Sequence, residues 1–174
     1  MRCNYPYAGY GTSVWNPVAD VEAGSVVGFQ LSSPINEHGV LNVYLSRAPN
    51  KVADYDGSGG WFKIYEVTAK TANGAWSFPT DNARNITFPL PKSIPSAEYL
   101  LRIEHISLQL ANKPYGARFY LACGQIAITG GGTANPATVL IPGVYKQDDP
   151  GILIDINKPA PAVYPQPGPK VFKG

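Results

Sequence analysis

Apolar and polar residues alternate in several short stretches of the chain, a period of two that is typical of strands with one face turned to a core. Residues 40–46 (VLNVYLS) and 61–67 (WFKIYEV) show this alternation clearly. Residues 21–31 (VEAGSVVGFQL) read as a strand that Gly24 interrupts, because β-branched residues follow the glycine. The first half of the chain is therefore predicted to consist of strands.

The second half has the same character. Residues 97–110 (AEYLLRIEHISLQL) fit a strand or a helix, and their β-branched content favours the strand. Residues 117–129 (ARFYLACGQIAIT) are the clearest strand candidate, and the glycines at 130–132 end it. A short strand is expected over 85–90, whereas from residue 142 onward proline and glycine predict an irregular tail over the surface.

Eighteen glycines and seventeen prolines separate these stretches along the whole chain rather than gathering in one tract. We therefore predict an all-β fold, a two-sheet antiparallel sandwich of the immunoglobulin-like or fibronectin-like kind with long loops. With 174 residues, the chain is expected to form a single domain over 1–174.

Composition excludes several classes of protein. Hydrophobic residues make up 44% of the chain and charged residues 15%, which is unlike a disordered protein. Lys and Arg total 14 against 12 for Asp and Glu, without a basic stripe, so a nucleic-acid partner is not expected. No apolar stretch is long enough for a membrane span, so no membrane partner is expected. The protein is expected to be a monomer.

The two cysteines, Cys3 and Cys123, form neither a CxxC pair nor a zinc pattern. One long-range disulfide is the economical interpretation, worth roughly 4 to 5 kcal/mol in the chain-entropy description and indicating an oxidising compartment. Two buried free thiols are the alternative. The sequon at Asn85 fits a surface loop of a secreted protein. A secretion leader, if there is one, is expected to precede Arg2 in the natural protein.

Several phrases share their order and spacing with one family. They cover nearly the whole chain and resemble the fungal lytic polysaccharide monooxygenases of auxiliary activity family 9, formerly glycoside hydrolase family 61. The resemblance implies that Cys3 pairs with Cys123, and that the family domain is longer at its front by a first strand and a substrate-facing loop. The matching phrases are GVLNVYLS at 39–46, WFKIYE at 61–66, AEYLLRIEHISLQLA at 97–111, GARFYLACGQIAITGGG at 116–132, IPGVYKQDDPGILIDI at 141–156 and YPQPGPKVFKG at 164–174.

The family's chemistry uses copper held by the amino group and imidazole of an N-terminal histidine and by a second histidine. This chain starts with Met1, and the resemblance places Glu37 at the second histidine's position. His38 is its neighbour and could replace it only if the loop slips by one residue. Nitrogen donors suit copper, so we expect a site unable to hold it and no cofactor.

The resemblance also implies losses around the metal position. Gln109 stands where the family has a histidine that positions oxygen, and Arg118 stands where it has a glutamine, while the axial tyrosine is kept as Tyr120. We therefore expect Glu37 and Arg118 to form an ion pair across the former site. His105 is expected to be partly buried and hydrogen-bonded rather than a ligand.

Carbohydrate binding remains possible without copper, because aromatic rings stack on the apolar faces of sugars. Tyr164 resembles a family tyrosine on the flat substrate surface, and Tyr5, Tyr7 and Tyr10 either add to that surface or cover the core. No hydrolase motif is present: the acidic residues form no distinguishable acid and base pair, and neither G-x-S-x-G nor HExxH occurs.

The sequence therefore predicts a secreted protein that binds cellulose, another β-glucan or xylan without oxidising it. One alternative is an active copper monooxygenase whose N-terminal histidine precedes the present sequence and whose site His38 completes. Another is an interaction or structural module of the cell wall.

Overall fold

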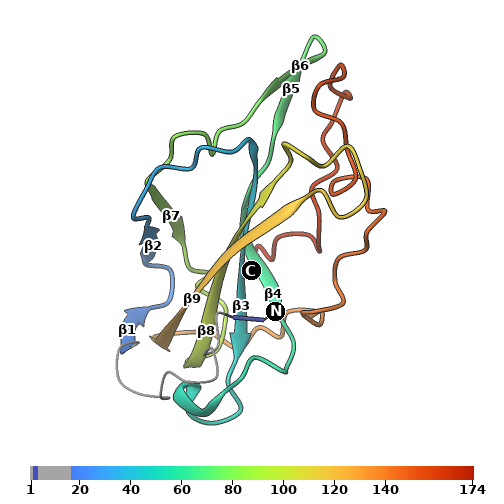
Figure 1. The fold of residues 1–174 in the computed structure, drawn as a ribbon. Coiled ribbons are helices and arrows are strands. Elements are labelled where there is room, and N and C mark those ends of the chain that lie inside the picture. Colours follow the sequence, from blue (N-terminus) through green and yellow to red (C-terminus); the bar gives the residue numbers. More distant parts are fainter. Residues whose placement is uncertain (1, 4–16) are drawn as a thin grey trace.

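A computed structural model describes residues 2, 3 and 17–174 of the chain. Strands dominate it, together with one short 3-10 turn, η1 (Figure 1). The strands are β1 (Val18–Glu22), β2 (Val26–Gln30), β3 (Gly39–Arg47), β4 (Phe62–Val67), β5 (Lys70–Ala72), β6 (Ala75–Ser77), β7 (Asn85–Pro89), β8 (Ala97–Ser107) and β9 (Arg118–Thr129), and η1 spans Val52–Asp54.

A five-stranded sheet in the order β1-β9-β8-β3-β4 forms the centre of the molecule. The long strands β3, β8 and β9 pair antiparallel along most of their length, with Leu41 opposite His105 and His105 opposite Tyr120. Residues 97–107 are extended, so the strand interpretation of this stretch is confirmed over the helical one.

The edge strand β1 departs from the expected pattern because it pairs with β9 in parallel. A parallel neighbour needs a long connection rather than a hairpin, and nearly a hundred residues separate β1 from β9. Gly24 divides the expected strand at 21–31 into β1 and β2, with a φ of +84° that glycine adopts readily. The predicted all-β sandwich with long loops is confirmed. The prediction that its sheets are purely antiparallel is wrong, because β1 pairs with β9 in parallel.

The alternation in β4 is interrupted by a β-bulge. Tyr65 lies opposite Val43, but Lys63 lies opposite the next residue of β3, Tyr44, so Ile64 is the extra residue. Lys63 and Glu66 therefore share one face of the sheet although they are three positions apart.

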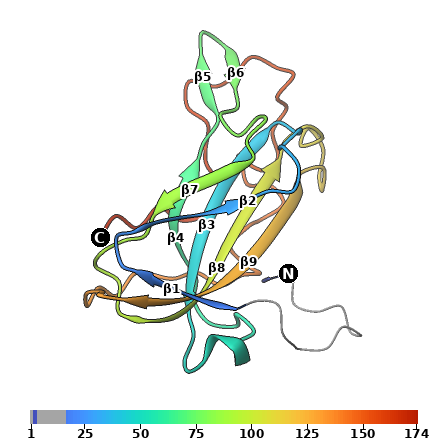
Figure 2. The ribbon, with the colours of Figure 1, turned by 90° about the vertical axis from the view of Figure 1, so that its left-hand side faces the viewer.

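The β2–β7 pair packs over one side of the large sheet, which we call the inner face (Figure 2). The core between the two sheets is built mainly of aliphatic and aromatic side chains and includes Val27 and Phe29 of β2 at its edge. Its buried members are Leu41, Val43, Leu45, Phe62, Ile64, Ile86, Phe88, Leu90, Ile94, Tyr99, Leu101, Ile103, Ile126 and Ile128.

The opposite side, the outer face, is covered by the irregular C-terminal segment rather than by a second sheet (Figure 1). Charged groups are buried here: Arg102 donates to Glu104, and Lys63 Nζ donates to Glu66 Oε2 at 2.9 Å and to the Pro167 carbonyl at 2.8 Å. Side chains of Lys63, Arg102 and Glu104 are at most 3% exposed. Burial lowers the pKa of Lys63, although Glu66 opposes that shift.

Neutral groups complete this outer-face network. Asn42 Nδ2 donates to Tyr145 Oη at 3.1 Å, and the Tyr145 hydroxyl donates to Glu104. Tyr44 and Tyr145 share a hydrogen bond of 2.6 Å, and Gln166 donates to Asn42 Oδ1 at 2.9 Å. The C-terminal segment is thus attached to β3 and β8 by directional contacts.

No described helix has the length and apolar character that crossing a membrane requires.

Candidate functional site

Glu37, Arg118 and Tyr120 converge on the inner face, where β3 begins and β9 starts. The Arg118 guanidinium donates to Glu37 Oε1 at 3.1 Å, and the Tyr120 hydroxyl donates to the same oxygen at 3.1 Å. The ion pair expected between Glu37 and Arg118 is therefore present. Its side chains are 19% and 51% exposed, so the pair lies at the rim of the sandwich rather than inside it.

The surroundings of Glu37 favour its charged form. A hydrogen bond from the Ser107 side chain is the largest cause of a lowered pKa, partial burial opposes it, and Tyr120 and Arg118 lower the pKa further. Ser107 ends β8 and is itself buried. The ionised form of the Glu37 carboxylate is consequently favoured. Its Oε1 accepts from the Tyr120 phenol and the Arg118 guanidinium, whereas its buried Oε2 has no hydrogen-bond partner among the described residues.

His38 is paired with Asp81 and not with the Glu37–Arg118 ion pair. Its Nδ1 lies 2.8 Å from Asp81 Oδ2, and its ring stacks on Phe78 with centroids 5.1 Å apart. The side chain is 53% exposed, and because Asp81 engages Nδ1, Nε2 is the nitrogen left for another partner. A role for His38 as a copper ligand stays a prediction.

His105 differs from expectation. It is only 7% exposed, so it is buried rather than partly buried as expected, and its Nε2 has no hydrogen-bond partner among the described residues. Its ring stacks on Tyr120 at 6.3 Å, and burial lowers its pKa, with Glu37 and Asp81 opposing the shift. Gly39 provides the room, because a side chain there would meet His105 Nε2 at 2.6 Å.

The remaining predicted site residues lie apart from this cluster. Gln109 is exposed in the turn after β8. Asn85, the predicted glycosylation site, is exposed at the start of β7 rather than in a loop, and its modification stays a prediction. Tyr5, Tyr7 and Tyr10 fall outside the described residues.

The expectation for Tyr164 as a sugar platform is wrong in this structure. Tyr164 is 4% exposed, its hydroxyl donates to the Gly151 carbonyl at 2.5 Å, and its ring meets Trp76 edge-on at 6.1 Å. A ring enclosed in this way offers no face to a polysaccharide. The error arose because sequence similarity located the tyrosine in a loop without indicating which way its ring turns.

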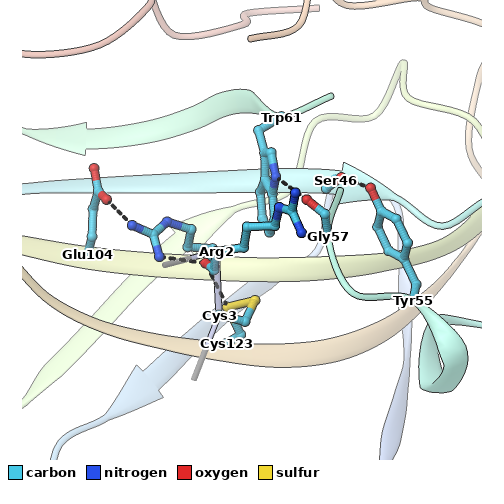
Figure 3. Close-up of a disulfide and its surroundings, with 9 residues drawn as sticks. Arg2, Cys3, Ser46, Tyr55, Gly57, Trp61, Glu104 and Cys123 are labelled. Atoms are coloured by element: carbon cyan, nitrogen blue, oxygen red, sulfur yellow. Dashed lines mark hydrogen bonds and ion pairs between the residues drawn. A yellow bond between two sulfur atoms is a disulfide. The ribbon is translucent and has the colours of Figure 1, made fainter. Parts of the chain in front are cut away.

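The disulfide between Cys3 and Cys123 is present, so the pairing implied by the resemblance is confirmed (Figure 3). It joins residue 3 to the outer face of β9. Beside it, Arg102 Nη1 donates to the Arg2 carbonyl at 2.6 Å, and Arg2 Nη1 lies 3.0 Å from Asp56 Oδ2. The bridge therefore connects the start of the chain to the buried charges of the outer face.

The described residues bring together no group of three or more His, Cys, Asp or Glu side chains able to hold a metal. What they place at the rim are two carboxylates, Glu37 paired with Arg118 and Asp81 paired with His38, together with the exposed imidazole of His38 and the buried imidazole of His105. This donor set does not fit a copper site built from three nitrogens.

Comparison with known proteins identifies the family. The model for Auxiliary Activity family 9, formerly GH61, matches residues 1–164. The chain belongs to auxiliary activity family 9. An AA9 family lytic polysaccharide monooxygenase C from Emericella nidulans is 43% identical over 176 residues, which cover 100% of this chain and 75% of the relative.

Solved structures of the AA9 family have the same fold. A cellulose-active polysaccharide monooxygenase from M. thermophila superposes with a TM-score of 0.83 and 32% identity, covering 99% of this chain and 79% of that one. The extended catalytic domain of LPMO9A from H. jecorina gives a TM-score of 0.83 and 31% identity, covering 90% of this chain and 65% of that one.

Sequence reasoning missed two features of this AA9 chain. One is Asp81, whose carboxylate orients His38 across 43 positions of sequence and has no local motif. The other is a group of exposed aromatic rings on and after the 108–117 loop, including Tyr115 at 86% exposure and Phe119 at 38%. The proline–tyrosine–glycine run at 114–116 could have revealed these exposed rings, because such a run predicts a tight turn whose middle residue, Tyr115, faces solvent.

Proposed function

We propose that this chain is a secreted AA9-family protein that binds polysaccharide without copper-dependent oxidation. The observation that supports this most directly is the Glu37 carboxylate, which stands where the family resemblance expects the second copper histidine and is paired with Arg118. A carboxylate engaged by a guanidinium and a phenol has no free nitrogen donor to offer, and imidazole and amine nitrogens are the ligands that suit copper.

Polysaccharide is the ligand class that family membership supports. One structural neighbour is described as cellulose-active, and the curated relatives are named as polysaccharide monooxygenases. Sugar binding does not depend on the metal, because it relies on ring faces and hydrogen-bonding groups spread over a surface. Secretion is supported by the Cys3–Cys123 disulfide, since disulfides persist in oxidising compartments.

Copper titration tests the oxidative part of the proposal. We expect isothermal titration of the purified protein with Cu(II) to show no tight one-to-one complex, and Glu37→Gln to leave that result unchanged. Retention on cellulose, xylan and chitin tests the binding part. A tight copper complex with nitrogen hyperfine structure in its electron paramagnetic resonance spectrum would overturn the first part, and no retention on any of the three would overturn the second.

An active copper monooxygenase is a second candidate, which one observation favours. His38 is exposed and oriented through Nδ1 by Asp81, and a metal-binding histidine usually has its other nitrogen held by a carboxylate in this way. The relatives with more than 40% identity also carry the monooxygenase name. If this candidate is right, a protein that carries the N-terminal histidine ahead of the present sequence binds copper tightly, and both His38→Ala and Asp81→Asn weaken that binding. In the non-oxidative proposal neither variant changes the copper titration of that protein.

A further inference from the structure

The segment between β8 and β9 presents a strained aromatic residue to solvent. Lys113, Pro114, Tyr115 and Gly116 form a turn closed by a hydrogen bond of 3.0 Å from the Gly116 amide to the Lys113 carbonyl. Tyr115 occupies its third position with a φ of +61°, a conformation that turns of this kind normally assign to glycine or asparagine. Its ring is nevertheless 86% exposed, so burial of the ring does not offset the strain.

The turn is fixed by close backbone packing. A side chain on Gly116 would meet the Leu110 carbonyl oxygen at 1.7 Å, and the Ile154 amide donates to the Ala111 carbonyl at 2.8 Å. The surrounding chain therefore imposes the conformation of Tyr115. Residues kept in sparsely populated backbone regions gather at functional sites, where the strain holds a group in position.

Tyr115 stands at the edge of an aromatic groove on the outer face. A hollow of about 310 Å³ is lined by Tyr115, Phe119 and Tyr145, with Lys113, Lys146 and Gln147 among its polar neighbours. A second hollow, of about 380 Å³, adjoins it and shares Phe119 and Tyr145. Two hollows on either side of one aromatic pair fit an extended chain better than a compact molecule. We call these two hollows the aromatic groove.

The rings of the groove are held rigidly. Phe119 and Tyr145 lie 5.4 Å apart between centroids. The Tyr145 hydroxyl is engaged by Tyr44, Asn42 and Glu104 of the outer-face network, and burial together with the Glu104 charge raises its pKa. Rings fixed before binding lose little entropy when a ligand stacks on them.

Charges at the groove do not select an ionic ligand. Lys113 and Lys146 contribute two positive groups, while Asp148 and Asp149 follow directly in sequence and Asp149 Oδ2 accepts from the Lys146 amide at 2.9 Å. Arg102, which lines the second hollow, is paired with Glu104, and the two aspartates beside Lys146 in sequence reduce the positive charge near the rings. The combination of aromatic faces with mixed polar groups suits a neutral sugar chain whose axial C–H groups form flat apolar faces.

We propose that the aromatic groove of Tyr115, Phe119 and Tyr145 binds one chain of a neutral β-linked polysaccharide, an inference that rests on the proposed binding function. Tyr115 and Phe119 stack on sugar rings, and the lysine and glutamine side chains donate hydrogen bonds to hydroxyl groups. The groove takes the place of the enclosed Tyr164 as the sugar-contacting surface.

Cellohexaose and xylohexaose titrated into the whole protein, together with retention on cellulose and xylan, test this inference. Tyr115→Ala and Phe119→Ala are each expected to weaken binding about tenfold, the loss of one stacked ring. Val163→Ala removes another exposed apolar side chain, 78% exposed and in the C-terminal segment, and is expected to bind as the unaltered protein does.

Tyr115→Gly separates binding from folding. Glycine tolerates the positive φ, so this variant is expected to raise the thermal midpoint by about 2–4 °C while weakening oligosaccharide binding as Tyr115→Ala does. If Tyr115→Gly lowers the midpoint and the affinity together, the ring has a structural role and the inference is wrong. If the unaltered protein binds and the Tyr115 and Phe119 variants bind equally well, the groove is wrong and the proposed function stands. If the unaltered protein binds none of these sugars, both fail.

Discussion

The inner and outer faces of the five-stranded sheet are both buried, but by contacts of different kinds. In β3, eight of nine residues are buried, and alternate side chains enter opposite environments. On the inner face Leu41, Val43 and Leu45 pack against other apolar groups, whereas on the outer face Asn42 and Tyr44 take part in a hydrogen-bonded network. Apolar packing tolerates changes of shape, while a buried polar network requires every partner.

The largest expected effect is on the outer face. Glu104→Gln keeps the shape of the side chain but leaves the Arg102 charge buried without a counter-ion, so we expect a loss of about 3–5 kcal/mol in the free energy of unfolding. Urea denaturation followed by tryptophan fluorescence measures it. The double variant Arg102→Met with Glu104→Leu should recover the part of the loss that comes from the unpaired charge, but not the part that comes from the Asn42 and Tyr145 donors of Glu104. A cost below about 1 kcal/mol for Glu104→Gln would show that the network is not tightly coupled.

A smaller effect is expected on the inner face. Leu101→Ala removes a side chain that is 4% exposed and leaves a cavity, for which we expect a cost of about 3 kcal/mol. Leu101→Met should cost less than about 1.5 kcal/mol in the same denaturation experiment, because its volume is similar. The difference between the two faces is supported only if Leu101→Met is tolerated on the inner face and Glu104→Gln is not tolerated on the outer face.

The smallest effect concerns pH and His105, which lies at the end of the inner-facing row of β8. Burial lowers the pKa of His105 in the folded protein below its usual value of about 6.5. As the pH falls, the histidine is therefore protonated in the unfolded chain before it is protonated in the folded protein. The free energy of unfolding is unaffected above about pH 6.5 and decreases below it, by no more than about 1.4 kcal/mol per pH unit.

His105→Gln should flatten this pH dependence in parallel denaturation series between pH 7.5 and 5. A variant at the exposed histidine, His38→Gln, is the matched control. If the two variants change the slope equally, burial of His105 is not the cause.

Alternation in the sequence was sufficient to predict the long strands β3, β4, β8 and β9, whereas the short strands β5 and β6 were not predicted. A period of two implies that Arg102 and Glu104 share one side of β8. It does not show that this side is buried, because the covering segment at 142–174 has no periodicity. The bulge at Ile64 could not be predicted either. An extra residue in β4 shifts the alternation of side chains between the two faces of the sheet, and no local sequence signal marks it.

The candidate site was predictable where it depends on strand register. Glu37, Arg118 and Tyr120 were expected together from the family resemblance, and pairing of β3, β8 and β9 brings them together. Tyr164 and Tyr115 were not predictable, because loop side chains follow the path of the backbone and the packing around it. The positive φ of Tyr115, which determines how its ring is presented, is a property of the folded turn.

Attachment of residues 167–172 to the sheet has a consequence for the order of folding. Lys63 donates to the Pro167 carbonyl, 104 positions further along the chain, and the Phe172 amide donates to the Lys63 carbonyl at 2.8 Å. During synthesis, Lys63, Arg102 and Glu104 therefore stay on an uncovered side of the sheet until residues 167–172 have left the ribosome. A chain that stops before those residues would leave this side open to water and to chaperones.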